Sequence, residues 1–149
     1  MIAQARVRLG DDADLRVIDG PRLPVDDASV DMVLVSLVLH SVPRADAVGI
    51  LREAARVLVP DGRVLVVDFG TSGLRFPRGW IGRGITVVAE LAAGPRHASH
   101  SLDYLRHGGL PALAGEAGLE THVSRPTAGG AITIAVLTPG RDCARTGPA

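Results

Sequence analysis

Four polar residues stand at or just past the ends of predicted strands, where their side chains are best placed to do chemistry. Asp19 follows the apolar segment 15–18, Ser36 and His40 lie at the end of the run 30–39, and Asp68 follows the run 64–67. In open α/β sheets, ligands bind outside the carboxyl ends of the strands. We therefore expect these residues to share a ligand-binding edge, with His40 as the candidate catalytic base.

Each of these residues also has an ordinary structural interpretation. Asp19 can cap a turn, Ser36 can be a buried hydroxyl with a hydrogen-bond partner, and Asp68 can begin a loop. A lone histidine after an apolar strand is more often packed and hydrogen-bonded than catalytic. Both interpretations stay open at this level.

Other constellations are weaker. His97, His100 and His107 are spaced so that one helical face can hold them, but no Cys or carboxylate completes a familiar ligand set, so we predict no metal site. The segment 70–73 (GTSG) resembles a phosphate cradle only loosely, because the chain contains no lysine. A Ser-His-Asp hydrolase is disfavoured because no Gly-x-Ser-x-Gly elbow is present.

The element that must position these residues is the stretch 30–69. Residues 30–39 form a nearly unbroken apolar run, which is typical of a strand buried on both faces. Apolar residues at spacings of three and four between 47 and 58 predict a helix, Pro60-Asp61-Gly62 ends it, and residues 64–67 form a second strand. Two strands joined through a helix make a right-handed crossover unit.

The rest of the chain adds shorter elements. We expect the end of a helix before residue 10, a short strand at 15–18, a loop at 21–29 and an irregular connection at 70–84. A helix is possible at 85–93, and a better one lies within 101–119, interrupted near Gly108-Gly109 and Pro111. Segments 119–124 and 131–137 form a terminal antiparallel hairpin. Residues 1–139 are expected to form a single domain, followed by a disordered tail at 140–149.

Composition narrows the function classes. The 149 residues include 16 basic and 16 acidic ones, scattered along the chain, so the basic footprint of a nucleic-acid-binding protein is missing. No apolar run is long enough to span a membrane, and we expect a cytoplasmic protein. The one cysteine, Cys143, cannot form an internal disulfide and lies in a polar tail.

Three segments occur together in an order known from one enzyme family. Residues 19–25 (DGPRLPV), 29–33 (SVDMV) and 51–63 (LREAARVLVPDGR) resemble class I S-adenosylmethionine-dependent methyltransferases, with the closest likeness to the ubiquinone and menaquinone biosynthesis type. Residues 101–105, 108–111 and 129–137 extend the resemblance over nearly the whole chain. It implies an α/β, Rossmann-like methyltransferase sheet, truncated, mostly parallel with a C-terminal antiparallel hairpin and with helices on both faces.

The resemblance also implies roles for individual residues. Asp19, with Gly20, would face the adenine of S-adenosylmethionine, and Ser36 and Leu37 would supply main chain near its methionine portion. Catalysis would rest mainly on proximity and orientation. If acid-base help is needed, His40 is the candidate, with Tyr104 and His100 on the acceptor side.

One departure from the family is large. The family begins with a strand and a Gly-rich cofactor-binding turn, followed by a second strand that ends in an acidic residue, and neither is found here. We therefore expect weak or absent cofactor binding. In the family's sheet the missing strands lie beside the strand predicted at 30–39, so that strand keeps a bare edge, and an apolar bare edge invites pairing. Either the segment 15–18 closes onto it, or a second chain does, and we favour a homodimer or a partner chain.

Two functions follow. The first is a methyltransferase-family protein that transfers a methyl group from S-adenosylmethionine to a small-molecule acceptor. The second is a non-catalytic or repurposed fold that acts as a binding module or as a subunit completing a partner's sheet. An incomplete gene product is a third possibility.

Overall fold

The computed structural model describes residues 2–10, 13–18, 20–70, 84 and 95–140. The helices are α1 (Ile2–Leu9), α2 (Arg44–Val57), α4 (Pro95–Arg106) and α5 (Gly109–Glu116), with 3-10 turns η1 (Leu39–Ser41) and η2 (Ala128–Gly130). The strands are β1 (Val30–Ser36), β2 (Leu58–Phe69), β3 (Leu119–Thr127) and β4 (Ile132–Pro139).

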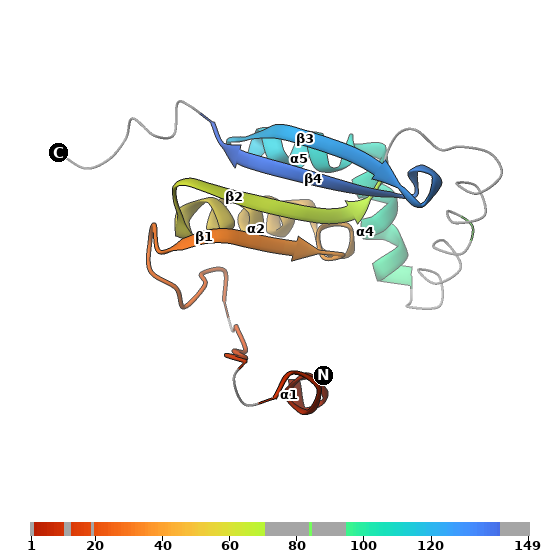
Figure 1. Ribbon diagram of the computed structural model, residues 1–149. Helices are drawn as coiled ribbons and strands as arrows, with labels where there is room; N and C mark the ends of the chain where they lie inside the picture. The colour runs from red at the N-terminus through yellow and green to blue at the C-terminus, as the bar shows by residue number, and fades with distance from the viewer. Residues whose placement is uncertain (1, 11–12, 19, 71–83, 85–94, 141–149) are drawn as a thin grey trace.

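The described strands form one four-stranded sheet in the order β1-β2-β4-β3 (Figure 1). β1 and β2 are parallel, whereas the β2–β4 and β4–β3 pairs are antiparallel. The α/β class and the C-terminal hairpin are thus confirmed, but the expectation of a mostly parallel sheet is wrong for the described strands, which form one parallel and two antiparallel pairs. Antiparallel pairs are the commoner kind among these strands because the segment 15–18, expected to be a strand, does not join the sheet.

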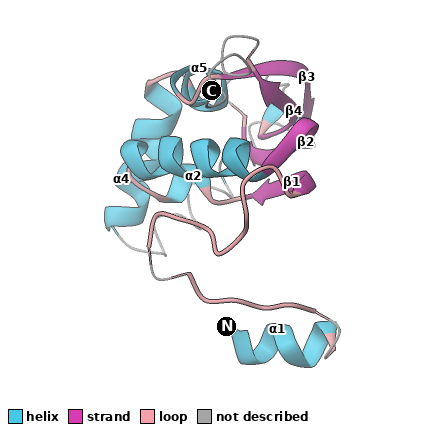
Figure 2. Ribbon diagram, turned by 90° about the vertical axis from the view of Figure 1, so that its left-hand side faces the viewer, coloured by secondary structure: helices cyan, strands magenta, loops and turns pink. Residues whose placement is uncertain are grey.

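Helices α2, α4 and α5 pack on one face of the sheet (Figure 2), so the expectation of helices on both faces is not met among the described residues. The helix predicted in the crossover is confirmed as α2, which buries Ala47, Val48, Leu51, Ala54 and Val57 at spacings of one, three and four residues. Asp46 in its first turn suits the positive end of the helix dipole. The core lies between these helices and the sheet, and its fully buried side chains include Leu39, Leu51, Leu113 and Leu137.

β2 begins earlier than the strand predicted at 64–67. Val30 pairs with Leu58 but Met32 pairs with Arg63, so the extra residues of β2 bulge out where Pro60, Asp61 and Gly62 stand. A Cβ at Gly62 would come within 2.8 Å of Leu58 Cδ2 and 2.9 Å of the Val59 oxygen. Pro60-Asp61-Gly62, predicted to end the helix in a turn, therefore form an irregularity within β2.

Other predictions have mixed outcomes. The helix before residue 10 is confirmed as α1. The helix expected within 101–119 is two helices, α4 and α5, separated near Gly108, whose φ of +87° lies in the left-handed region that favours glycine. The predictions for most of 70–84, for 85–93 and for 141–149 lie outside the described residues.

The predicted strand at 15–18 is wrong. These residues are described without strand pairing, and the chain leads from them away from the sheet to α1, which buries no residue (Figures 1 and 2). The side chain of Arg16 instead binds the carboxylate of Asp14 and the carbonyl of Pro24. A four-residue apolar segment cannot form a strand without a partner beside it. β1 is consequently an edge strand of the described sheet.

Candidate functional site

The ends of β1 and β2 bring His40 and Asp68 together. His40 Nδ1 lies 2.5 Å from Asp68 Oδ1, and both side chains are buried, Asp68 completely. The two residues are 28 positions apart in the sequence. The parallel pairing of β1 with β2 places the carboxyl ends of both strands at one edge of the sheet. The predicted ligand edge therefore contains a buried imidazole–carboxylate pair.

Backbone hydrogen bonds hold the Asp68 carboxylate in place. Asp68 Oδ2 accepts the Leu39 N–H at 2.9 Å, and Oδ1 accepts the Phe69 N–H at 2.7 Å. An ionised carboxylate in a buried position needs such donors to offset its desolvation. Because Leu39 belongs to η1, the same carboxylate fixes the turn that carries His40.

Aromatic and hydroxyl groups complete the surroundings of His40. The imidazole stacks on the Phe69 ring, with 3.7 Å between centroids and 16° between planes. Ser101 Oγ donates to the His40 carbonyl at 3.3 Å, and Tyr104 Oη donates to the Phe69 carbonyl at 3.3 Å. Both hydroxyl groups come from α4, so this helix ties the ends of β1 and β2 together.

Tyr104 supports the end of β2 through its hydrogen bond to the Phe69 carbonyl. Its side chain is buried, and burial, followed by the negative charge of Asp68, raises the pKa of Tyr104 far above its ordinary range. The phenol is therefore a hydrogen-bond donor at all ordinary pH values. His100 is half-buried one turn earlier on α4, in a small space lined also by Leu39 and Tyr104.

The predicted cofactor residues lie closer to solvent. Ser36 and Leu37 are exposed at the end of β1, and Leu37 adopts a φ of +53°, at the point where the chain leaves the strand for η1. Gly20 is exposed in the segment before β1, while Asp19 lies outside the described residues. The structure thus brings His40 together with Tyr104 through Phe69, and places Gly20 on a separate segment.

An ionic cluster anchors the Gly20 segment to α2. Glu53 Oε2 accepts the Leu23 N–H at 2.9 Å and pairs with Arg56, whose guanidinium also binds Asp27 and the carbonyl oxygens of Leu23 and Val25. The hydrogen bond from Arg56, reinforced by that from the Leu23 amide, lowers the pKa of Glu53 to about 2. Arg56 belongs to the segment 51–63 that carries the family resemblance.

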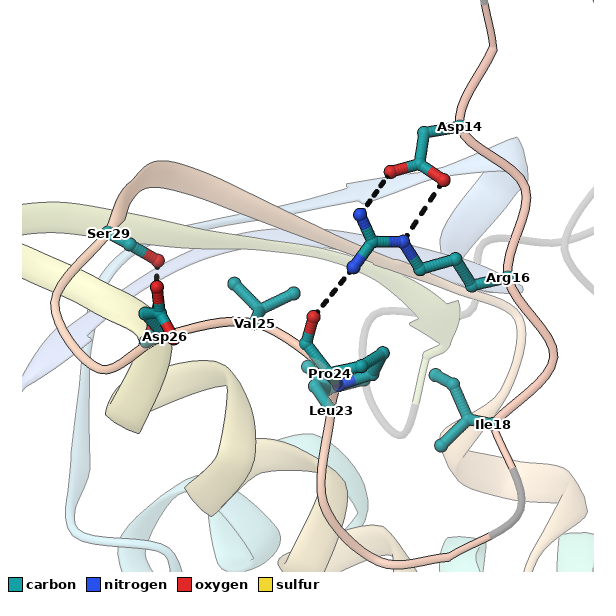
Figure 3. A pocket seen from close by; sticks show the side chains of 8 residues that line it. All are labelled: Asp14, Arg16, Ile18, Leu23, Pro24, Val25, Asp26 and Ser29. Carbon is teal, nitrogen blue, oxygen red and sulfur yellow. Dashed lines mark hydrogen bonds and ion pairs between the residues drawn. The ribbon is translucent and has the colours of Figure 1, made fainter.

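Two grooves border this segment. One, of about 590 Å³, lies against α2 and is lined by residues that include Ile18, Gly20, Ala45 and Ile50. The other, of about 510 Å³, is lined by Asp14, Arg16, Ile18, Leu23, Pro24, Val25, Asp26 and Ser29 (Figure 3). There the Arg16 guanidinium is already engaged by Asp14 and the Pro24 carbonyl. Neither groove is lined by His40 or Asp68.

Sequence reasoning singled out Asp68 but not its partnership with His40. No local spacing reveals a contact over 28 residues; only the parallel crossover does. Ser101 lies in the segment 101–105 that carries part of the resemblance, but its contact with the His40 carbonyl was not predicted. Within the described part of the chain, no cluster of three or more His, Cys, Asp or Glu residues is placed to hold a metal ion. None of the described helices is long and apolar enough to cross a membrane.

Comparison with known proteins finds methyltransferases by sequence. Residues 1–66 match the methyltransferase domain family. The ubiquinone/menaquinone biosynthesis C-methyltransferase UbiE of Rubrivivax gelatinosus is 32% identical over 110 residues, which are 70% of this chain and 41% of that protein. The chain therefore spans well under half the length of this curated relative.

Solved structures share the fold. A SAM-dependent methyltransferase from Aquifex aeolicus superposes with a TM-score of 0.58 at 14% identity, over 91% of this chain and 60% of that one. The O-methyltransferase NcsB1 from neocarzinostatin biosynthesis, in complex with S-adenosyl-L-homocysteine and 1,4-dihydroxy-2-naphthoic acid, superposes with a TM-score of 0.50 at 26% identity, over 79% of this chain and 31% of that one.

Proposed function

We propose that this chain, a class I S-adenosylmethionine-dependent methyltransferase-family protein by its sequence match and its fold, transfers a methyl group to a small molecule whose reacting atom loses a proton. The buried His40–Asp68 pair at the carboxyl ends of β1 and β2 carries this proposal. The sequence match to the methyltransferase domain family and the methyltransferase relatives favour this function over a repurposed fold.

The residues at the end of β1 suit part of the cofactor. The hydroxyl of exposed Ser36 matches the polar amino-acid end of S-adenosylmethionine, and the half-exposed Leu37 side chain offers an apolar contact. S-adenosylmethionine, when bound, supplies a methyl group on a positively charged sulfur. These contacts are few, so we expect weak affinity.

The chain's own acid-base chemistry follows from the His40 pair. An ionised Asp68 carboxylate, 2.5 Å from Nδ1, favours the tautomer that carries its proton on that nitrogen. We assign to His40 the proton that the acceptor atom would lose on methylation.

The acceptor class follows from this base. A hydroxyl group, or a carbon activated by one, loses a proton on methylation and benefits from His40, whereas a thioether does not. The relatives are consistent with both options, since NcsB1 is an O-methyltransferase and UbiE a C-methyltransferase. We therefore propose a hydroxylated small molecule. A cytoplasmic location stays a prediction, which cell fractionation would check.

The test is transfer of labelled methyl groups from S-adenosylmethionine to a panel of hydroxylated naphthoic acids and quinols. We expect transfer by the native chain, and at least a 10-fold loss of rate in Asp68→Asn, with a changed pH profile because the imidazole loses its negative partner. Ser124→Ala, on exposed β3, is the matched control and should keep full activity.

Two outcomes would overturn the proposal. One is an absence of transfer to every acceptor in the panel although the native chain binds the cofactor. The other is an Asp68→Asn variant that keeps both the native rate and the native pH profile. Circular dichroism of each variant separates loss of fold from loss of chemistry.

A further inference from the structure

The outer edge of β1 carries unpaired backbone groups in the described sheet. The Leu37 N–H donates to the Val67 carbonyl of β2 at 2.8 Å. Backbone groups alternate in direction along a strand, so Val33 and Val35 also face β2. The N–H and C=O groups of Met32, Leu34 and Ser36 therefore face away from β2, toward the open edge.

The two edges of the sheet differ in character. β3, at the other edge, carries Glu120, His122, Arg125 and Pro126, and all but its first residue are exposed. Charges and proline are the usual means of protecting an edge strand against pairing. β1 (VDMVLVS) has a single charge, Asp31, and no proline. Only the β1 edge lacks these protections.

Most of the exposed apolar side chains of the described residues belong to the N-terminal part of the chain, which includes β1. Of the exposed large hydrophobic residues in the described part of the chain, most lie before η1: Val7, Leu9, Val17, Ile18, Met32, Leu34, Leu37 and Val38. Met32 and Leu34 are 62% and 61% exposed, and they alternate with Val33 and Val35, which pack on the core, so they lie on the sheet face opposite the core. α1 and the segment that follows it, residues 2–18, project beyond β1 as an arm (Figure 1).

We propose that β1 pairs with β1 of a second copy of this chain, antiparallel and centred on Val33. In this register all seven residues of β1 find a partner, and the outward-facing groups of Met32 meet those of Leu34 in the other copy. Their side chains then form apolar cross-strand pairs on the exposed face. The two four-stranded sheets become one continuous sheet.

Charge and size favour a second copy in this register. The two Asp31 carboxylates lie about 14 Å apart, roughly four residues along the strands, which exceeds the screening length at physiological salt. A seven-residue edge is about 24 Å long and by itself gives less than the roughly 1,200 Å² of a stable interface. The arm of each copy, with its exposed Val7, Leu9 and Val17, supplies the missing apolar area by lying over the other copy.

The first test is the mass of the full chain by size exclusion with light scattering at about 10–100 µM. We expect twice the 15.5 kDa of one chain for the native protein. Leu34→Pro removes an outward N–H without touching the β1–β2 ladder, and should halve the mass. Leu34→Lys, which keeps the backbone intact, should also halve it, whereas Leu102→Lys, at an exposed leucine of α4, should leave the dimer unchanged.

The second test fixes the register. Opposite residues of a non-hydrogen-bonded antiparallel pair lie about 4.5 Å apart, which suits a disulfide. In a Cys143→Ser background, Val33→Cys should crosslink two copies on oxidation, and Val35→Cys should not. A monomer at 100 µM, a dimer that survives both Leu34 variants, or crosslinking through Val35→Cys alone would overturn the proposal. None of these outcomes depends on whether the chain transfers methyl groups.

Discussion

The carboxylate of Asp68 has two tasks, because its oxygens bind the His40 ring as well as the backbone of η1 and β2. Sequence position alone identified both residues as lying at strand ends, since apolar runs mark where strands stop. Their contact could not be predicted from residue types, because it depends on the parallel register of β1 and β2. For Asp68 and His40, the sequence therefore predicts the position at a strand end but not the contact between the two side chains.

Glu53 offers a prediction on pH. Its hydrogen bonds to Arg56 and Leu23 lower its pKa from 4.5 to about 2, so the folded state binds a proton less readily than the unfolded state. Its contribution to stability is thus fully present above pH 4.5 and is lost as the pH falls toward 2. Partial exposure weakens this contribution through solvent screening.

We expect Glu53→Gln to lower the free energy of unfolding at pH 7 by about 1 kcal/mol, because a charge-assisted pair with Arg56 becomes a neutral one. The difference between the variant and the native chain should shrink as the pH falls from 5 to 2.5. Urea unfolding at four pH values measures this. A difference that stays constant over the range would show that the Glu53 charge does not contribute.

At the scale of elements, the crossover 30–69 was predicted well because its periodicities differ clearly: apolar runs for the strands and spacings of three and four for α2. The segment 15–18 was predicted wrongly because an apolar composition does not supply a neighbouring strand. Gly108-Gly109 indicated the interruption between α4 and α5, because the positive φ that glycine adopts readily at position 108 is incompatible with a continuous α-helix.

The junction of β2 with η2 yields a second prediction. A Cβ at Gly70 would lie 2.3 Å from the Gly130 oxygen and 3.1 Å from Thr133 Oγ1. Because backbone must move to make room, Gly70→Ala should lower the free energy of unfolding by about 1–3 kcal/mol.

Gly115 on α5 provides the matched control. A Cβ there meets nothing within 4 Å. Alanine should therefore raise the free energy of unfolding by up to about 1 kcal/mol through its higher helix propensity. Urea denaturation at pH 7 compares the two variants, and equal effects at both positions would contradict the crowding seen at Gly70.

At the scale of the whole molecule, the chain combines a buried His40–Asp68 pair with an edge strand that lacks an outer neighbour in the described sheet. Both features follow from one arrangement, because the carboxyl end of β1 carries Ser36, Leu37 and His40 while its outer edge stays open. The likeness to the methyltransferase family could be inferred from residues 19–63. The open edge could be inferred only by comparing the chain with the strand order of that family.

Calorimetric titration with S-adenosyl-L-homocysteine tests the central claim most directly, because the proposed methyl transfer requires that the chain hold its cofactor near the end of β1. We predict saturable binding with a Kd of about 1 mM or tighter. Ser36→Asp, whose charge repels the ligand's carboxylate, should weaken it at least fivefold, while Ser124→Asp on β3 should not. No heat from the native chain at millimolar ligand, or equal affinity in Ser36→Asp, would contradict this account.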